Sequence, residues 1–327
     1  MISVEAPDGV GEVIEGDDLT GLVAGACALH DGDIVTITSK VVSKAEGRSR
    51  LGDREEAIAG ETVRVVARRG PTSIVRNHLG LTMAAAGIDA SNVTAGHHLL
   101  LPEDPDATAR TIRAGLRERT GHNVAVVITD TAGRPWRDGQ TDIAVGAAGL
   151  VVLEDFAGRT DAYGNPLAVT APAVADELAG VAELAASKLS GRPFTVVRGR
   201  DDLVLPADDD GLGAAVLIRP DGSDMFGYGS REAVLRALTR TGGQTFGSPA
   251  SSGDLHRALV ELVGPAEGRV AVTAPDTIEI SLPARQRSLL GDVETLAFAF
   301  GWARSRESDH QSVDSAVVLL KITVREA

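Results

Sequence analysis

The chain has 327 residues, of which 43% are hydrophobic and 24% charged, a composition typical of a globular protein with one or two domains. Its net charge of −14 disfavours a nucleic-acid partner, because an acidic surface repels the phosphate backbone. A single cysteine, Cys27, excludes an intrachain disulfide and a zinc site with several cysteines. No apolar run approaches the roughly 18 residues of a membrane span, and the N-terminus lacks a basic stretch and an apolar signal core. We therefore expect a cytoplasmic protein without a membrane partner.

Short runs of β-branched residues predict buried strands, and apolar residues at helical spacing predict helices between them. The predicted strands are, in chain order, Ile34–Thr38, 62–66, 124–129, 195–197 and 215–218. Helices are predicted over residues 107–121 and 171–189. The first of these carries Arg110, Arg113, Arg117 and Arg119. We expect these arginines to face solvent, with anion binding as the alternative. The pattern indicates an α+β (mixed α/β) fold.

Glycine, serine and proline cluster over residues 246–254, between two helical patterns, and predict a domain boundary. We therefore expect a main domain over residues 1–246 and a small α+β module over residues 247–327. The elements predicted for this module are a helix near 255–262, strands near 270–273 and 277–280, a helix from about Ser288 and a strand near 316–324.

Several common catalytic motifs are missing from the sequence. It contains no GxxxxGK[S/T] phosphate-binding loop, no HExxH zinc motif and no GxSxG nucleophile motif. The chemistry must therefore be sought in polar clusters that directly follow apolar runs, where binding loops on a rigid scaffold commonly lie.

The first cluster follows the strand predicted over Ile34–Thr38. If a helix begins after this strand, its free N–H groups and the hydroxyl of Ser39 can hold a phosphate, and Lys44 can add a positive charge. A capped helix with exposed lysines fits the same spacing.

The second cluster follows the apolar stretch that ends before Asp89. Aspartate oxygens are suited to magnesium or manganese, and Asn92 can form a hydrogen bond with a nucleotide. A plain turn built from aspartate and asparagine is equally consistent with this segment.

The third cluster follows the apolar strand predicted over residues 124–129. Its polar members are Asp130, Thr131, Arg134, Arg137, Asp138, Gln140 and Asp142, with Trp136 among them. Asp130 and Thr131 are well placed at the end of a strand to hold a metal, and the two arginines can hold carboxylates or phosphates. Because a structural loop rarely needs so many charged groups, we interpret this segment as functional.

Five segments form a series that is specific to one family. They are TSKVVSKAEGR, NHLGLTMAAAGIDASNV, ITDTAGRPWRDGQTDIAVGAAGL, DAYGNPL and AVADELAGVAEL. In this order they closely resemble the coenzyme F-420-0:L-glutamate ligase (gamma-glutamyl ligase) family. The resemblance runs from about Val10 to about Gly229, and its most specific part is DTAGRPWRDGQTD.

The resemblance implies an amide-forming ligase that attaches L-glutamate to the lactyl carboxylate of a deazaflavin precursor. GTP would phosphorylate this carboxylate, and the amine of glutamate would displace phosphate from the acyl phosphate, leaving GDP and a γ-linked glutamyl product. Divalent cations, Mg²⁺ or Mn²⁺, are implied as cofactors, with K⁺ as a further candidate. The alternatives are a nucleotide- or deazaflavin-binding protein without ligase activity and a metal-dependent phosphohydrolase.

Site residues follow from the resemblance position by position. Asp89 and Asp130 match ligands of a first divalent metal, and Thr131 matches a ligand of a second. Ser39, Lys44 and Asn92 match contacts to GTP, and residues 10–13 match a nucleotide-contacting segment. Lys188 stands near the place of a further second-metal ligand, which is often glutamine or glutamate; a protonated lysine cannot bind a metal. On charge grounds we assign Arg134 and Arg137 as catalytic candidates that hold the precursor's phosphodiester or the incoming glutamate.

The family fold is an intertwined homodimer, which we expect here. Many actinobacterial relatives carry in addition a flavin-dependent nitroreductase-like domain. Such a domain needs on the order of 200 residues, whereas about 75 follow the predicted boundary. The chain thus resembles the ligase domain alone, and we expect neither FMN nor reductase activity. For the C-terminal module we expect a packing or dimer-contact role, with regulation as the alternative.

Overall fold

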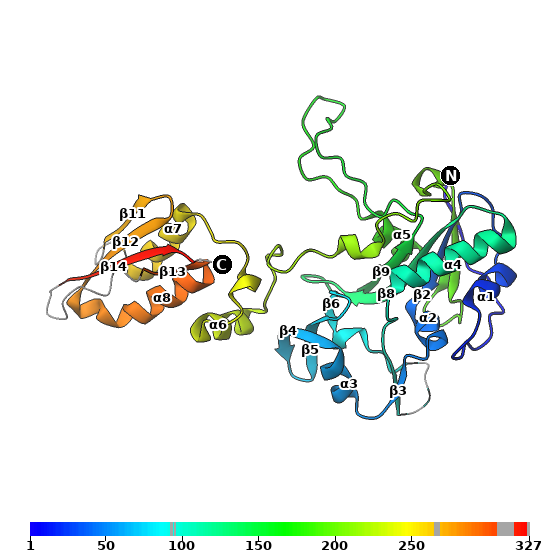
Figure 1. The fold of residues 1–327 in the computed structure, drawn as a ribbon, viewed down its shortest axis with the longest axis horizontal. Helices are drawn as coiled ribbons and strands as arrows, with labels where there is room; N and C mark the ends of the chain where they lie inside the picture. The colour runs from blue at the N-terminus through cyan, green and yellow to red at the C-terminus, as the bar shows by residue number, and fades with distance from the viewer. Residues whose placement is uncertain (92–93, 95, 265–268, 306–316, 326–327) are drawn as a thin grey trace. The chain divides into compact units, whose positions relative to one another are not determined.

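The computed structural model describes residues 1–91, 94, 96–264, 269–305 and 317–325. The chain divides into two compact units (Figure 1). The first comprises Met1–Val65 and Arg69–Ile218, and the second comprises Val66–Arg68 and Arg219–Ala327. Both mix helices and strands, which confirms the predicted α+β class. In the described part of the chain, no helix is both long and apolar enough to cross a membrane.

A five-stranded sheet forms the centre of the first unit. Its order is β1 (Ser3–Glu5), β10 (Phe194–Arg198), β2 (Ile34–Thr38), β8 (Ala125–Gly133) and β9 (Gln140–Ala148). Only β2 and β8 are parallel, in a register that pairs Ile34 with Ala125 and Thr38 with Thr129; the other neighbours are antiparallel. The carboxyl ends of β2 and β8 therefore lie at the same edge of the sheet.

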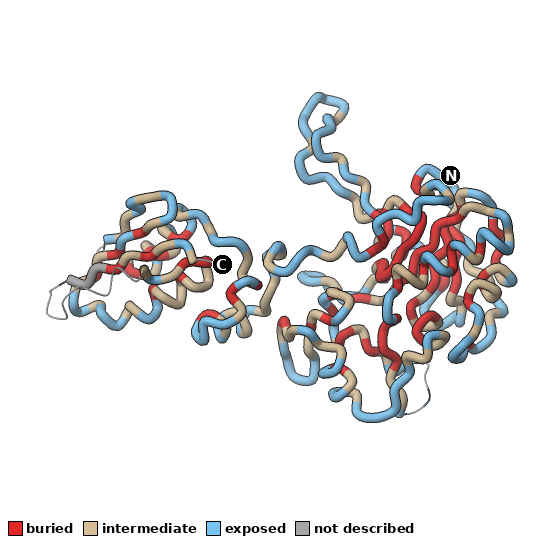
Figure 2. Tube along the Cα trace, in the orientation of Figure 1, coloured by how far each residue is buried: buried red, intermediate tan, exposed pale blue. Residues whose placement is uncertain are grey.

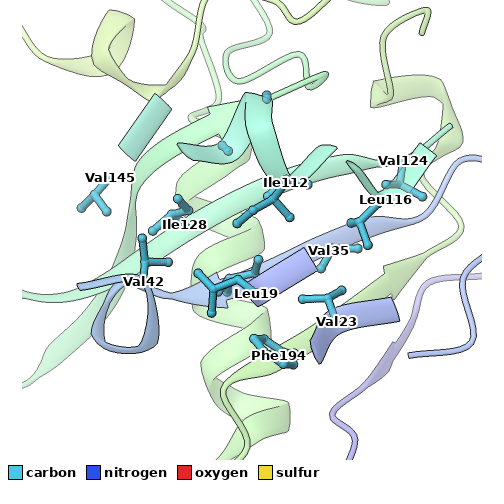
Figure 3. Packing of buried hydrophobic residues seen from close by; sticks show 14 of the residues in the cluster. Leu19, Val23, Val35, Val42, Ile112, Leu116, Val124, Ile128, Val145 and Phe194 are labelled. Carbon is cyan, nitrogen blue, oxygen red and sulfur yellow. The ribbon is translucent and has the colours of Figure 1, made fainter. Parts of the chain in front are cut away.

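Helices cover both faces of this sheet, which explains why β2 and β8 are apolar on both sides. On one face, Val35, Ile37, Val126 and Ile128 pack with residues of α1 (Leu19–Ala26) and α4 (Pro105–Thr120) (Figure 3). The alternate residues Ile34, Ala125 and Val127 pack on the other face with α5 (Val174–Ala186). The buried residues of the first unit gather along these strands (Figure 2).

Smaller elements connect the strands of the first unit. They are α2 (Ser39–Ala45), β3 (Ser49–Leu51), α3 (Arg54–Glu61), β4 (Thr62–Arg69), β5 (Thr72–Asn77), β6 (Thr82–Ala84), η1 (Ala85–Gly87), β7 (His97–Leu99), η2 (Asp201–Leu203) and η3 (Ala214–Leu217). β3 pairs with β7, and β4, β5 and β6 form a three-stranded sheet. Between β9 and α5 the chain forms a long loop that contains one bridge, between Thr160 and Pro166.

The structure confirms most elements predicted for the first unit. The strand Ile34–Thr38 forms as predicted, and the strands predicted over 62–66, 124–129 and 195–197 form within longer strands. The helix predicted over 171–189 ends three residues early, because Ser187 adopts a positive φ of 64°. The strand predicted over 215–218 is wrong. This segment forms the 3-10 helix η3, because the Asp106 carboxylate accepts the N–H groups of Ala214 and Ala215.

The second unit has a sheet and a core of its own. Its elements are α6 (Ser230–Thr239), η4 (Gly243–Phe246), α7 (Ser252–Val263), β11 (Arg269–Ala274), β12 (Thr277–Pro283), η5 (Ala284–Leu289), α8 (Leu290–Ala299), β13 (Trp302–Arg304) and β14 (Val317–Val324). An antiparallel sheet of order β11-β12-β14-β13 packs on α7 and α8 around Leu255, Ile278, Val293 and Trp302. The helices and strands predicted for the C-terminal module form here, and β13 is an additional strand.

The second unit begins at Arg219, earlier than the boundary predicted over residues 246–254. The intervening residues pack with α8, since the ring of Phe246 lies edge-on to Phe298 at 6.1 Å and Arg240 forms an ion pair with Glu294 at 2.7 Å. The roles assigned to residues 1–246 and 247–327 remain predictions.

One arginine of α4 is buried, contrary to the expectation that all four face solvent. Arg113 is 4% exposed. The five N–H groups of its guanidinium donate to six acceptors, because the two protons of Nη2 are shared among three oxygens. The acceptors are the carbonyl oxygens of Val124, Leu205, Pro206 and Asp209 and the side chains of Asn123 and Asp210. A Cβ atom at Gly149 would lie 2.1 Å from Arg113 Nε, so this glycine makes room for the guanidinium. Arg113 thus fixes the loop before η3 against α4 and the sheet.

Replacing Arg113 should destabilise the first unit even when the charge is kept. In Arg113→Lys, a single ammonium group cannot reach acceptors arranged around a planar guanidinium, so several buried oxygens lose their partners. We expect a loss of about 2–4 kcal/mol in the free energy of unfolding, measured by urea denaturation with circular dichroism. The exposed Arg110, changed to lysine, is the matched control and should shift it by less than about 0.5 kcal/mol. Equal midpoints for the two variants would contradict this account.

Candidate functional site

The candidate site lies at the edge of the sheet where β2 and β8 end. β2 ends at Thr38 and α2 begins at Ser39, while β8 continues past Thr129 to Asp130. Because Thr38 pairs with Thr129 in parallel register, the next residues of both strands are neighbours. The buried Ser39 Oγ donates a hydrogen bond of 2.8 Å to Asp130 Oδ1.

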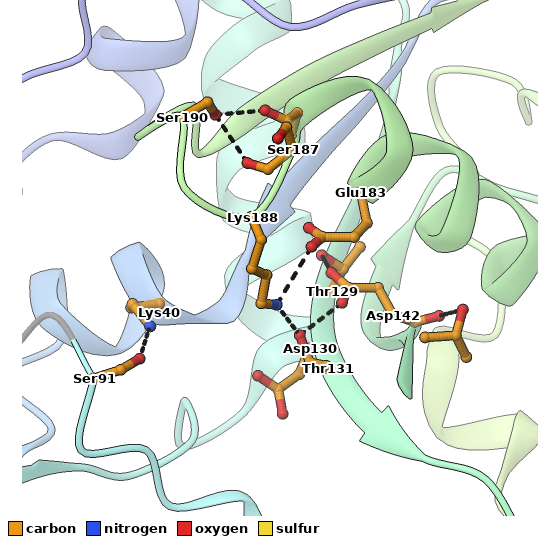
Figure 4. A network of polar contacts seen from close by, with 12 residues as sticks. Lys40, Ser91, Thr129, Asp130, Thr131, Asp142, Glu183, Ser187, Lys188 and Ser190 are labelled. Atoms are coloured by element: carbon orange, nitrogen blue, oxygen red, sulfur yellow. Dashed lines mark hydrogen bonds and ion pairs between the residues drawn. The ribbon is translucent and has the colours of Figure 1, made fainter. Parts of the chain in front are cut away.

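Asp89 joins this edge through the residue that follows Ser39. Lys40 Nζ lies 2.6 Å from Asp89 Oδ2. It also donates to Ser91 Oγ at 2.8 Å (Figure 4). The backbone of Asp89 is held by hydrogen bonds with Leu99, and Ser91 N donates to Asp89 Oδ1 at 2.7 Å. Burial acts to raise the pKa of Asp89, but Lys40 and Ser91 together hold it below its ordinary value. Two consecutive residues of α2 thus bind the two aspartates.

The carboxyl group of Asp130 carries a strongly shifted pKa of about 7. Burial is the largest cause, and the negative charges of Asp142 and Asp89 raise the pKa further. The hydrogen bonds from Ser39 and from the backbone N–H of Thr131 act in the opposite direction without offsetting burial. Among the described residues, no cation forms an ion pair with Asp130, and in such an environment a bound cation stabilises the ionised form.

Thr131 lies beside Asp130 within a second network of polar contacts. Its hydroxyl donates to Asp142 Oδ1 at 2.7 Å across the β8–β9 pair, and Thr129 donates to Asp142 Oδ2 at 3.3 Å. Lys188, just after α5, donates to Thr131 Oγ1 at 2.5 Å and lies 3.4 Å from Glu183 Oε1 (Figure 4). Lys188 is thus in contact with the residue matched to the second metal.

The predicted nucleotide-binding residues are placed as follows. Ser39 contacts Asp130, as described. Lys44, in the last turn of α2, lies 2.5 Å from the carboxylate of Glu12, so it contacts the segment 10–13 that resembles a nucleotide-contacting one. Asn92 lies outside the described residues.

The two arginines predicted to be catalytic lie in the loop between β8 and β9. Arg134 Nη2 donates to the carbonyl oxygen of Asp138 at 2.6 Å, and Arg137 is exposed. Within the residues that the structure covers, neither arginine forms a hydrogen bond or ion pair with Asp89 or Asp130. The loop carries their charges at the end of the same strand, and the side chain of Arg137 is accessible to a ligand.

Sequence reasoning did not single out three participants in the site. Lys40 and Ser91 each adjoin a predicted site residue, and their roles arise from contacts between segments far apart in the chain. Glu183 lies within the helix predicted over 171–189, and its role arises from its ion pair with Lys188. The position of Lys40 directly after Ser39 was the available signal. Asp142 was noted only as part of a polar segment, although its place opposite Thr131 in a hairpin could have marked it as a partner.

The donor set fits one divalent ion better than two. Asp89 and Asp130 offer hard carboxylate oxygens at one edge of the sheet, and such oxygens suit Mg²⁺ or Mn²⁺. Across the described ranges, no three histidine, cysteine, aspartate or glutamate side chains are grouped to hold a metal. An ion at the two aspartates would therefore take its other ligands from water or substrate phosphates, as Mg²⁺ commonly does. At Thr131, the ammonium of Lys188 donates to the hydroxyl oxygen, and its positive charge would repel a second ion bound there.

Comparison with known proteins identifies the family. A model of the F420-0:gamma-glutamyl ligase family matches residues 9–54 and 51–199. The coenzyme F420:L-glutamate ligase of Methanopyrus kandleri is 40% identical over 210 residues, which cover 58% of this chain and 83% of the relative. The proteins of the same name from Archaeoglobus fulgidus and Halobacterium salinarum are 38% identical over 218 residues and 40% identical over 219. The match to the Archaeoglobus fulgidus protein covers 61% of this chain and 88% of the relative. The match to the Halobacterium salinarum protein covers 59% of this chain and 85% of the relative. Since the family model matches more than half of the sequence, the chain belongs to the F420-0:gamma-glutamyl ligase family.

Proposed function

We propose that this chain is a GTP-dependent ligase that joins L-glutamate to the lactyl carboxylate of coenzyme F-420-0. Ligation of glutamate to coenzyme F420 is what its relatives are named for. The observation that carries the proposal is the pair of aspartates, Asp89 and Asp130, bound by consecutive residues at the carboxyl end of two parallel strands. Open sheets of this kind bind ligands at that edge.

The reaction must turn an unreactive carboxylate into an acylating agent. A lactyl carboxylate oxygen attacks the γ-phosphorus of GTP, the bond to the β–γ bridging oxygen breaks, and GDP leaves. The amine of glutamate then attacks the carbonyl carbon, the acyl C–O bond breaks, phosphate leaves, and the amine nitrogen loses a proton. Both steps gather negative charge on phosphoryl oxygens, so the site must supply positive charge and orientation.

Each side chain of the site has a role in this scheme. Asp89 and Asp130 would hold Mg²⁺ or Mn²⁺, which when bound supplies positive charge to the phosphoryl oxygens. Ser39 orients the Asp130 carboxylate through its hydrogen bond, and Lys40 fixes Asp89. Lys44 provides a charge for the nucleotide beside residues 10–13. Arg134 and Arg137, on the adjoining loop, would hold the precursor's phosphodiester or the carboxylates of glutamate.

A direct assay tests the ligation. The protein incubated with coenzyme F-420-0, GTP, Mn²⁺ and L-glutamate should add glutamyl units to the coenzyme, detected by mass spectrometry. Asp130→Asn should lower kcat at least about 100-fold with an unchanged circular dichroism spectrum, because the amide carries no charge for the cation. Asp208→Asn, with its carboxylate exposed in the loop before η3 and outside the polar clusters of the site, is the matched control and should stay within about twofold of the parent activity.

Three results would redirect this assignment. A precursor that a known ligase extends but this protein leaves unchanged excludes the ligase. GTP hydrolysis that ignores both glutamate and precursor indicates a phosphohydrolase at the same aspartates. Calorimetric binding of GDP without any product indicates a nucleotide-binding protein that does not ligate.

The pKa of Asp130 predicts how stability depends on pH without metal. An unfolded aspartate ionises near pH 4, whereas folded Asp130 keeps its proton up to about pH 7. Between these values the folded state binds more protons than the unfolded state, so the free energy of unfolding falls as the pH rises. Above pH 7 folding bears the full cost of ionising the buried Asp130 carboxyl. With a chelator present, Asp130→Asn should therefore gain about 1–3 kcal/mol relative to the parent between pH 4 and pH 8, measured by urea unfolding.

Added Mn²⁺ should reverse this order at pH 8. Binding of the ion to the folded state stabilises the parent protein by mass action. The variant Asp130→Asn has only one of the two carboxylate ligands, so it binds the ion weakly and gains little. The melting temperature of the parent should rise with Mn²⁺ concentration, and that of the variant should stay nearly constant. An equal rise in both proteins would place the cation elsewhere.

A further inference from the structure

The hydroxyl of Thr131 already forms two hydrogen bonds. It carries one proton, which it donates to Asp142 Oδ1 at 2.7 Å, and its oxygen accepts from Lys188 Nζ at 2.5 Å. A divalent ion bound to that oxygen would lie beside the ammonium group, and the neutral threonine has no negative charge to offset the repulsion between the two positive charges. At Asp89, by contrast, the carboxylate is itself negative and can bind an ion beside Lys40. The site at Thr131 therefore holds either the ammonium or a metal.

The chain after α5 is arranged so that Lys188 reaches this position. Ser187 adopts φ of 64° and donates its N–H to Glu183 O at 2.9 Å, which turns the chain sharply after the last helical residue. The hydroxyl of Ser190 bonds to the carbonyl oxygens of Ala186 and Ser187 and holds the turn. Figure 4 shows the Lys188 side chain directed from this turn toward Thr131. A positive φ at serine is unfavourable and persists where the surroundings impose it.

The charges around Lys188 explain why an ammonium is retained there. Asp130, Asp142 and Glu183 are all carboxylates, and Lys188 is the cation that contacts Thr131 directly and forms an ion pair with Glu183 at 3.4 Å. Its side chain is nevertheless 63% exposed. An ammonium group has three N–H donors, so with Thr131 and Glu183 engaged, one remains to donate to an anionic oxygen of a ligand.

We propose that the ammonium group of Lys188 takes the place of a second metal ion, so that the chain binds one divalent cation, at Asp89 and Asp130. The remaining N–H of Lys188 donates to a phosphoryl or carboxylate oxygen of the substrate. The substrate part of this inference rests on the proposed ligase function, whereas the count of metal ions does not.

The number of bound Mn²⁺ ions tests the inference. Titration of the full chain with Mn²⁺ in the presence of GDP, followed by electron paramagnetic resonance of the free ion, should give one ion per chain. In Lys188→Gln the repelling charge is gone and an amide oxygen becomes available, so two ions should bind. Lys188→Arg keeps the charge and should bind one. Arg192→Gln removes a positive charge four residues away, which pairs with Asp8 instead, and should also bind one.

The outcomes separate this inference from the ligase proposal. Two ions in the parent chain, or one ion in both the parent and Lys188→Gln, would overturn the role of Lys188 whether or not the protein ligates glutamate. If ligation is found, Lys188→Gln should also lower kcat at least tenfold, with its activity depending on Mn²⁺ at higher concentrations than in the parent. A kcat and a Mn²⁺ dependence equal to those of the parent would show that Lys188 does not contact the substrate. Because the side chain is largely exposed, circular dichroism should confirm that each variant is folded.

Discussion

The parallel pairing of β2 with β8 is the constraint on which the candidate site depends. Antiparallel neighbours would send Ser39 and Asp130 to opposite edges of the sheet, whereas the parallel register that pairs Thr38 with Thr129 makes them adjacent. A parallel pair needs a long crossover connection, and the connection between β2 and β8 carries Asp89. The same connection also contains α4, which covers the sheet and buries Arg113. The chain segment that makes the pairing possible thus also supplies the second carboxylate.

The site is complete within the first unit as far as the described contacts reach. Its carboxylates, hydroxyls and lysines all lie between Glu12 and Lys188, and the second unit has its own buried core around Leu255 and Trp302. Relatives are covered over 83–88% of their lengths by only 58–61% of this chain. The family match over residues 9–54 and 51–199 includes the candidate site and ends before Arg219, so it does not extend to the core of the second unit. The chain carries that core in addition to the matched part. An independent core allows such an addition without changing the packing around the site.

Sequence patterns predicted local structure well where the surroundings of a segment match its pattern. The β-branched run Ile34–Thr38 became a buried strand because both faces of the sheet are covered by helices. Patterns failed where a distant residue decides. The apolar segment at residues 215–218 became a 3-10 helix because Asp106 captures its N–H groups, and Arg113 became buried because distant carbonyl oxygens surround it. Family motifs pointed to Ser39, Asp89 and Asp130, but the pairing of Lys40 with Asp89 required the fold.

Charge balance connects the two aspartates with the lysines. Burial acts to raise the pKa of both aspartates. At Asp89 the hydrogen bonds from Lys40 and Ser91 outweigh burial, so its pKa falls. At Asp130 the hydrogen bonds from Ser39 and the backbone of Thr131 do not, so its pKa rises to about 7. Lys188 contacts Thr131, the residue that follows Asp130. A cation bound at Asp130 would offset the negative charges around it. A further cation at Thr131 would lie next to the ammonium group of Lys188, which would repel it. The fixed charges of the site therefore favour one exchangeable metal ion, at the aspartates, next to the ammonium group of Lys188.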